Sequence, residues 1–133
     1  MVSAKLFGTA MIVGAALIAA TPPAALASGG QQARLGLMNL TIKGHTAKDF
    51  RTSLLACGPD AGTHPQPDAA CEAISDAEGD FHAIDRVAGP CPLIFDPVTV
   101  RAAGVFDGRP VDYAETFSNT CVAANATGGV FAF

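Results

Sequence analysis

The chain has 133 residues, enough for one domain, with 50% hydrophobic residues and a formal net charge of −4. This acidic balance argues against nucleic acid and anionic membrane surfaces as partners. Four cysteines without a Cys-x-x-Cys pair, together with three scattered histidines, argue against a zinc site, and we expect neither a metal nor another cofactor.

The first 27 residues have the pattern of a secretory signal peptide. Lys5 supplies a positive charge, residues 6–20 are almost wholly apolar, and Ala25-Leu26-Ala27 is a small-x-small cleavage motif. The apolar run is short for a membrane span of about 20 residues, although an uncleaved anchor is the alternative interpretation. We predict a secreted, extracellular protein with a flexible tail at 28–34 and one domain at 35–133, without membrane contact after cleavage.

The four cysteines all follow the predicted cleavage motif. An even number in an exported chain predicts two disulfides, and three pairings are formally possible. A core of about 100 residues is marginal, so that such bridges would add needed stability. The cysteines are Cys57, Cys71, Cys91 and Cys121.

The first half of the domain predicts two strands and a helix. Residues 35–42 alternate apolar with small or polar residues, which indicates a strand. Residues 50–57 form a second strand candidate, although part of this run would also suit a helix, and 58–62 is a turn cluster. A helix is predicted over 67–80, with Pro67 in its first turn and a glycine at its end, followed by a short helical turn at 80–84.

The clearest unit is a hairpin over 98–117. Two alternating runs flank Asp107-Gly108, the dipeptide of a two-residue type I′ turn. The expected register pairs Phe106 with Arg109 and Ala102 with Tyr113, and it gives the hairpin one apolar and one solvent-facing side. The aromatic C-terminal residues 128–133 are expected to pack against the sheet.

No motif of an enzyme is present. The chain lacks Gly-x-Ser-x-Gly, His-Glu-x-x-His, a phosphate-binding loop and a dinucleotide fingerprint. No pairing of a nucleophile with a base is evident, and the clustered carboxylates around Glu78 fit the solvated side of a helix. We therefore predict that the chain is not an enzyme.

The unusual segment is Gly89-Pro-Cys-Pro-Leu-Ile-Phe-Asp-Pro97. Its prolines fix φ near −65° and push the preceding residues toward extended geometry, which predicts a stiff, extended segment. Leu93-Ile94-Phe95 is then either a short buried strand or an exposed apolar bait. Composition favours burial, while the proline frame and the neighbouring Cys91 favour exposure, and the residues alone leave both open.

Several separated motifs, in the right order, resemble the Streptomyces subtilisin inhibitor family. The resemblance covers the chain from about Leu35 to Phe133. The motifs are Gly62-Thr-His-Pro65, Cys91-Pro-Leu-Ile-Phe-Asp-Pro97, Gly104-Val-Phe-x-Gly108-Arg, Phe117-Ser-Asn119-x-Cys121 and Val130-Phe-Ala-Phe133. The chain departs from the family pattern at Phe106, where tryptophan is common, and at Tyr113-Ala114-Glu115, where Tyr-Glu-Arg is common.

The resemblance implies a fold and a disulfide pairing. The fold is α+β, a five-stranded antiparallel sheet with two helices packed on one face. The pairing implied is Cys57–Cys71 and Cys91–Cys121. Members of the family are usually homodimers, so we expect a homodimer here.

The resemblance also implies inhibition of subtilisin-like serine proteases, and of chymotrypsin-like ones with the same apolar preference. The family's reactive bond, two residues after the third cysteine, corresponds to Leu93–Ile94. Asn119 would brace the loop, the alternative being an asparagine that caps backbone in a turn. The implied protease-contact residues are Gly89, Pro90, Cys91, Pro92, Phe95 and Asp96.

A second function on the same fold is a partner, substrate or inhibitor of a secreted transglutaminase. Such an enzyme uses exposed glutamine and lysine side chains as acceptors. Gln31, Gln32 and Lys43 lie near the predicted flexible tail, where an enzyme could reach them.

Overall fold

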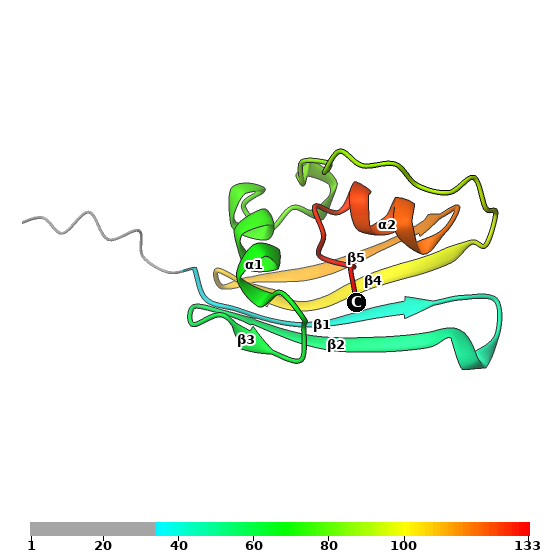
Figure 1. The fold of residues 1–133 in the computed structure, drawn as a ribbon. Coiled ribbons are helices and arrows are strands. Elements are labelled where there is room, and N and C mark those ends of the chain that lie inside the picture. The colour runs from blue at the N-terminus through cyan, green and yellow to red at the C-terminus, as the bar shows by residue number, and fades with distance from the viewer. Residues whose placement is uncertain (1–33) are drawn as a thin grey trace, which may run out of the picture.

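The computed structural model describes residues 34–133 (Figure 1). The predicted signal peptide at 1–27 and nearly all of the predicted tail lie outside the described residues. Over 34–133, no helix combines the length and the apolar character that a membrane crossing requires.

Five antiparallel strands form one sheet, and two helices lie on one of its faces (Figure 1). The strand order is β3-β2-β1-β4-β5. The strands are β1 (Gly36–Lys43), β2 (Phe50–Cys57), β3 (Ala61–Gly62), β4 (Val98–Phe106) and β5 (Arg109–Phe117), and the helices are α1 (Pro67–Asp76) and α2 (Thr120–Ala126). Short 3-10 turns are η1 (Ala47–Asp49) and η2 (Phe81–Ala83). The predicted fold class and both disulfides are confirmed.

The sheet has one buried and one exposed face because side chains alternate along each strand. In β1, Met38, Leu40 and Ile42 are buried beneath the helices, whereas Leu37 is 57% exposed on the other face. The same alternation in β4 buries Val98, Val100, Ala102 and Phe106. The hydrophobic core therefore lies between the sheet and the two helices.

The hairpin of β4 and β5 has the predicted register. Phe106 pairs with Arg109 and Ala102 pairs with Tyr113. Asp107 and Gly108 have φ values of 50° and 73°, as a type I′ turn requires. Local turn chemistry and strand alternation were therefore sufficient to predict this unit.

Helix α1 ends at Asp76, so the predicted end at Asp80 is wrong. Glu78 takes up the left-handed conformation, with φ of 54°, and its N–H donates to the Ser75 carbonyl. The N–H of Gly79 donates to the Ile74 carbonyl at 2.9 Å. These two bonds form a Schellman motif, in which Glu78 rather than the glycine that follows it occupies the left-handed C′ position. The short helical turn expected at 80–84 is present as η2.

Ala61 and Gly62, predicted as part of a turn, form the short edge strand β3. They pair with Ala56 and Leu55 of β2. Gly62 has φ of 112°, and a Cβ at that position would overlap the carbonyl oxygen of Leu54. A strand of two residues is too short to show an alternating pattern in the sequence, so β3 could not be predicted from it.

The C-terminal residues pack into the core, as predicted. Val130 and Phe131 are fully buried, and the Phe131 ring lies 6.4 Å from that of Tyr113, centroid to centroid. His64 Nδ1 accepts a hydrogen bond from the Gln66 N–H at 3.0 Å, so Nε2 carries the proton and donates to the Val130 carbonyl at 2.9 Å. The buried His64 thus ties the C-terminal segment to the start of α1.

Glu115 stands where the family pattern noted above has arginine, and it is hydrogen-bonded to Tyr113. The Tyr113 hydroxyl donates to Glu115 Oε2 at 2.8 Å. Burial, and then the bond to this carboxylate, raise the pKa of Tyr113 far above its usual value. Tyr113 therefore stays neutral, and Glu115 satisfies its hydroxyl at the edge of the core.

We expect Gly104→Ala to destabilise the domain by roughly 3 kcal/mol, because the new Cβ would overlap the Leu37 carbonyl oxygen and force β1 away from β4. Gly108→Ala is the matched control. Gly108 also has a positive φ but has no atom within 4 Å of an added Cβ, so only the conformational cost of about 1 kcal/mol remains. Urea unfolding with the disulfides intact measures both, and equal losses would contradict the close approach of β1 and β4.

Candidate functional site

Residues 85–97 form an extended segment without regular secondary structure, which arches over α2 between η2 and β4 (Figure 1). The side chain of Leu93 is fully exposed, that of Ile94 is 60% exposed and that of Phe95 is 83% exposed. Of the two interpretations left open by the sequence, the short buried strand is therefore wrong. The three apolar residues stand in solvent.

This exposure is unfavourable for folding, since burying a side chain of this size stabilises a protein by about 1.5–3 kcal/mol. Three adjacent exposed apolar side chains on an ordered segment are typical of a surface that contacts another macromolecule. The segment therefore has the form of a recognition loop.

The side-chain amide of Asn119 holds the loop on both sides of Leu93. Asn119 Nδ2 donates to the Ile94 carbonyl at 2.9 Å and to the Pro92 carbonyl at 3.3 Å. Successive carbonyls of an extended chain point to opposite sides. With the carbonyls of Pro92 and Ile94 turned toward the protein, the Leu93 carbonyl between them is directed outward.

The same side chain begins helix α2. Asn119 is its N-cap residue, in extended conformation, and its Oδ1 accepts a hydrogen bond from the Val122 N–H at 2.9 Å. Asparagine is among the preferred residues at this position because it satisfies one of the free N–H groups of the first turn. Capping was left as the alternative to loop support, and the structure shows that one buried side chain makes both sets of contacts.

Two further connections attach the limbs of the loop to the N-terminal end of α2. On the amino-terminal side, Cys91 is bridged to Cys121, with their Cα atoms 5.7 Å apart. On the carboxyl-terminal side, the Asp96 N–H donates to the Ser118 carbonyl at 2.8 Å. Both limbs are thereby fixed to a single short helix and the turn that precedes it.

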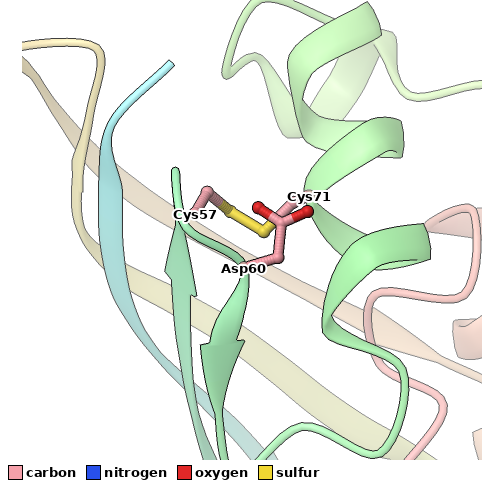
Figure 2. Close-up of side chains that lie close together, drawn as sticks. All are labelled: Cys57, Asp60 and Cys71. Carbon is pink, nitrogen blue, oxygen red and sulfur yellow. A yellow bond between two sulfur atoms is a disulfide. The ribbon is translucent and has the colours of Figure 1, made fainter. Parts of the chain in front are cut away.

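A group of side chains of the types that bind metal ions lies at the carboxyl-terminal end of β2 and is structural. Figure 2 shows Asp60 beside the Cys57–Cys71 disulfide. The two sulfurs are bonded to each other and offer no thiolate to a metal ion. Asp60 Oδ1 accepts a hydrogen bond from the Gly58 N–H at 3.1 Å, which closes the turn between β2 and β3. The bridge joins the end of β2 to α1.

Comparison with known proteins places this architecture in a family. Residues 35–119 match the family model described as subtilisin inhibitor-like. The chain belongs to the subtilisin inhibitor-like family. The subtilase-type protease inhibitor of Streptomyces fradiae is 48% identical over 86 residues, which are 62% of this chain and 61% of that protein. Subtilisin inhibitor-like protein 5 of the same organism is 41% identical over 103 residues, covering 71% of this chain and 94% of that protein.

A solved structure supports the assignment. Sermetstatin of Streptomyces caespitosus, in complex with Bacillus licheniformis subtilisin, is 37% identical and has a TM-score of 0.58, covering 74% of this chain and 99% of that chain. These named members of the subtilisin inhibitor-like family include protease inhibitors and no enzyme, which agrees with the prediction that this chain is not an enzyme.

The sequence analysis missed one polar residue that contacts the loop of this subtilisin inhibitor-like domain. Asn125, in the last turn of α2, donates from Nδ2 to the Gly89 carbonyl at 3.1 Å. Helix α2 was implied only by the family resemblance and was not placed on residues, so the direction of Asn125 could not be inferred. An asparagine six positions after Asn119 was the only signal.

We expect Asn119→Asp and Asn119→Ala to separate the two contacts of this side chain. Aspartate keeps the capping oxygen but removes the donor to Pro92 and Ile94, whereas alanine removes both and costs about 1–2 kcal/mol of stability. Amide hydrogen exchange is the measurement. The Val122 amide should stay protected in the aspartate variant only, while the loop amides should exchange faster in both. A loop that stays protected in the aspartate variant would contradict the bracing contact.

Proposed function

We propose that this protein is a secreted inhibitor of subtilisin-type serine proteases, and that Leu93–Ile94 is the bond that it presents to the protease. The observation that carries the proposal is the position of Leu93, with its side chain fully exposed and the carbonyls before and after it held by Asn119. The complex of the structurally similar sermetstatin with subtilisin supports the choice of protease.

The mechanism follows from how serine proteases recognise substrates. The protease serine attacks a carbonyl carbon in an extended chain, while donors in the oxyanion hole bind its oxygen. The outward carbonyl of Leu93 is available for this contact. Leu93 would fill the primary specificity pocket, and residues 89–96 would line the protease cleft. Because the loop is already extended before binding, little conformational entropy is lost on association.

Attachment of both limbs explains inhibition rather than turnover. If the serine oxygen bonds to the Leu93 carbonyl carbon, the C–N bond to Ile94 breaks and the leaving nitrogen takes a proton from the protease histidine. The Cys91–Cys121 bridge and the Asp96–Ser118 hydrogen bond hold the two new ends together. The Ile94 amine can then attack the acyl group and reform the bond before water does.

Secretion and dimerisation belong to the same proposal. The exposed face of the sheet carries Leu37, Leu54 and Val105, each more than 40% exposed, and a second copy would bury them. Sedimentation equilibrium tests the dimer, for which a monomer at micromolar concentration counts against it. Export with removal of residues 1–27 is tested by the N-terminal sequence of the extracellular protein.

The transglutaminase hypothesis stays a prediction. Lys43 is exposed at the end of β1, while Gln31 and Gln32 lie outside the described residues. Incorporation of a labelled amine or glutamine donor by a secreted transglutaminase tests it, and a chain that takes up neither label is not a substrate.

We expect Leu93→Lys to weaken inhibition of subtilisin by roughly 100-fold and to create inhibition of trypsin. The apolar pocket of subtilisin receives leucine well, whereas the trypsin pocket contains a carboxylate that binds a cation. Leu93→Met conserves volume and is the matched control, with inhibition expected to stay close to wild type. Inhibition constants against both proteases decide the matter, and an unchanged selectivity would discard the assignment of the bond.

We expect the double variant Cys91→Ser/Cys121→Ser to become an ordinary substrate. Without the bridge the amino-terminal limb can leave the protease after cleavage, so cleaved protein accumulates, as mass spectrometry would detect. Cys57→Ser/Cys71→Ser is the control. It loses about 3 kcal/mol of stability but leaves the loop attachment intact, so inhibition should persist wherever the variant is folded. Persistent inhibition by the first variant would refute the role of the bridge.

A further inference from the structure

We propose that Asn125 is a positioning residue that holds the amino-terminal limb of the reactive loop, residues 87–91, against α2. The inference rests on the proposed function, since it assigns this residue to the inhibitory loop. It concerns the half of the loop that Asn119 contacts only at Pro92.

Asn125 forms hydrogen bonds with the loop backbone like those between neighbouring β-strands. Its backbone carbonyl accepts a hydrogen bond from the Val87 N–H at 3.0 Å. Its side-chain Nδ2 donates to the Gly89 carbonyl at 3.1 Å and lies 3.3 Å from Cys91 Sγ. One residue therefore offers an acceptor and a donor to alternate positions of an extended chain, which is the pattern of a β-bridge.

The limb has little else to order it. Residues 85–90 are all exposed, so no side chain between the buried Ile84 and Cys91 is fixed by packing in the core. Within the described residues, two backbone groups of 85–90 form a hydrogen bond with a nitrogen or oxygen atom of another segment. They are the Val87 N–H and the Gly89 carbonyl, and both bond to Asn125.

The two asparagines mark the two ends of α2. At about 1.5 Å per residue, Asn119 and Asn125 lie roughly 9 Å apart along the helix axis, and Cys121 with its bridge lies between them. Asn119 fixes the residues next to Leu93, and Asn125 fixes the chain that leads to them. The seven-residue helix α2 therefore positions the loop along its length.

This placement gives Asn125 a defined part in inhibition. After cleavage the limb ending at Leu93 stays in place only through the Cys91–Cys121 bridge and the contacts of its backbone with α2. Without the Asn125 amide the limb can swing about the bridge, so the acyl group and the Ile94 amine separate more often. The effect should fall on dissociation and cleavage rather than on the rate of association, which depends on the exposed Leu93 side chain.

The test compares Asn125→Ala and Asn125→Asp with wild type. Aspartate has the same size but no donor, so both variants should behave alike. We expect about tenfold weaker inhibition of subtilisin, equivalent to about 1.4 kcal/mol, through a faster dissociation rate constant. Cleavage of Leu93–Ile94 should be faster by a similar factor. In the free variants, the Val87 amide should exchange at least tenfold faster.

Ser53→Ala is the control for general destabilisation. Ser53 is buried in β2, and its hydroxyl hydrogen-bonds to that of Thr63. In the sheet, β1 separates β2 from β4 and β5, the strands that α2 contacts. This variant should lower the melting temperature without changing the dissociation rate constant, the cleavage rate or the exchange of Val87. If Ser53→Ala reproduces the kinetic changes at a similar melting temperature, the role assigned to Asn125 is refuted.

The outcomes separate this inference from the proposed function. Wild-type protein that does not inhibit subtilisin overturns the proposed function, and the inference with it. Wild-type protein that inhibits, together with Asn125 variants of equal dissociation rate and equal resistance to cleavage, overturns the inference alone. An aspartate variant that matches wild type while the alanine variant does not would show that side-chain volume, and not the donor, holds the limb.

Discussion

The exposed loop at 85–97 depends on the side chain of Asn119, which connects two segments that are each unstable alone. Helix α2 has seven residues, too few to persist in water without capping and packing. The loop has no apolar anchor at its tip. The oxygen of Asn119 caps the helix and its nitrogen holds the loop, so each segment is ordered through contact with the other.

The core that stabilises the domain and the exposed apolar loop lie on different parts of the molecule. The core between the sheet and helices contains Leu40, Val100 and Phe131, all essentially without exposure. The Cys57–Cys71 bridge joins α1 to the end of β2, whereas the loop is attached to α2. The exposed side chain of Leu93 contributes nothing to the core. This separation means that residues at the loop tip can change with little effect on the free energy of unfolding.

What the sequence could predict was local. The turn at Asp107-Gly108 and the alternation beside it set the hairpin register before any tertiary contact is considered. The strand β3 and the end of α1 were mispredicted because each is decided by a backbone contact, with Leu54 and Ile74 respectively. Loop exposure was ambiguous because Leu-Ile-Phe also suits a buried strand, while the proline frame and Cys91 favour exposure. Only the family resemblance, carried by motifs around Cys91 and Asn119, decided for the exposed arrangement.

The chemistry of the two asparagines explains why this residue type stands at both ends of α2. At position 119 the side chain must accept from the Val122 N–H and donate to two carbonyls at once. Aspartate can only accept, lysine can only donate, and serine is too short to span helix and loop; the primary amide provides both groups in one plane. At position 125 the backbone carbonyl is already the acceptor, so the side chain need only donate. The requirement at 119 is therefore the stricter one, although the two residues are chemically identical.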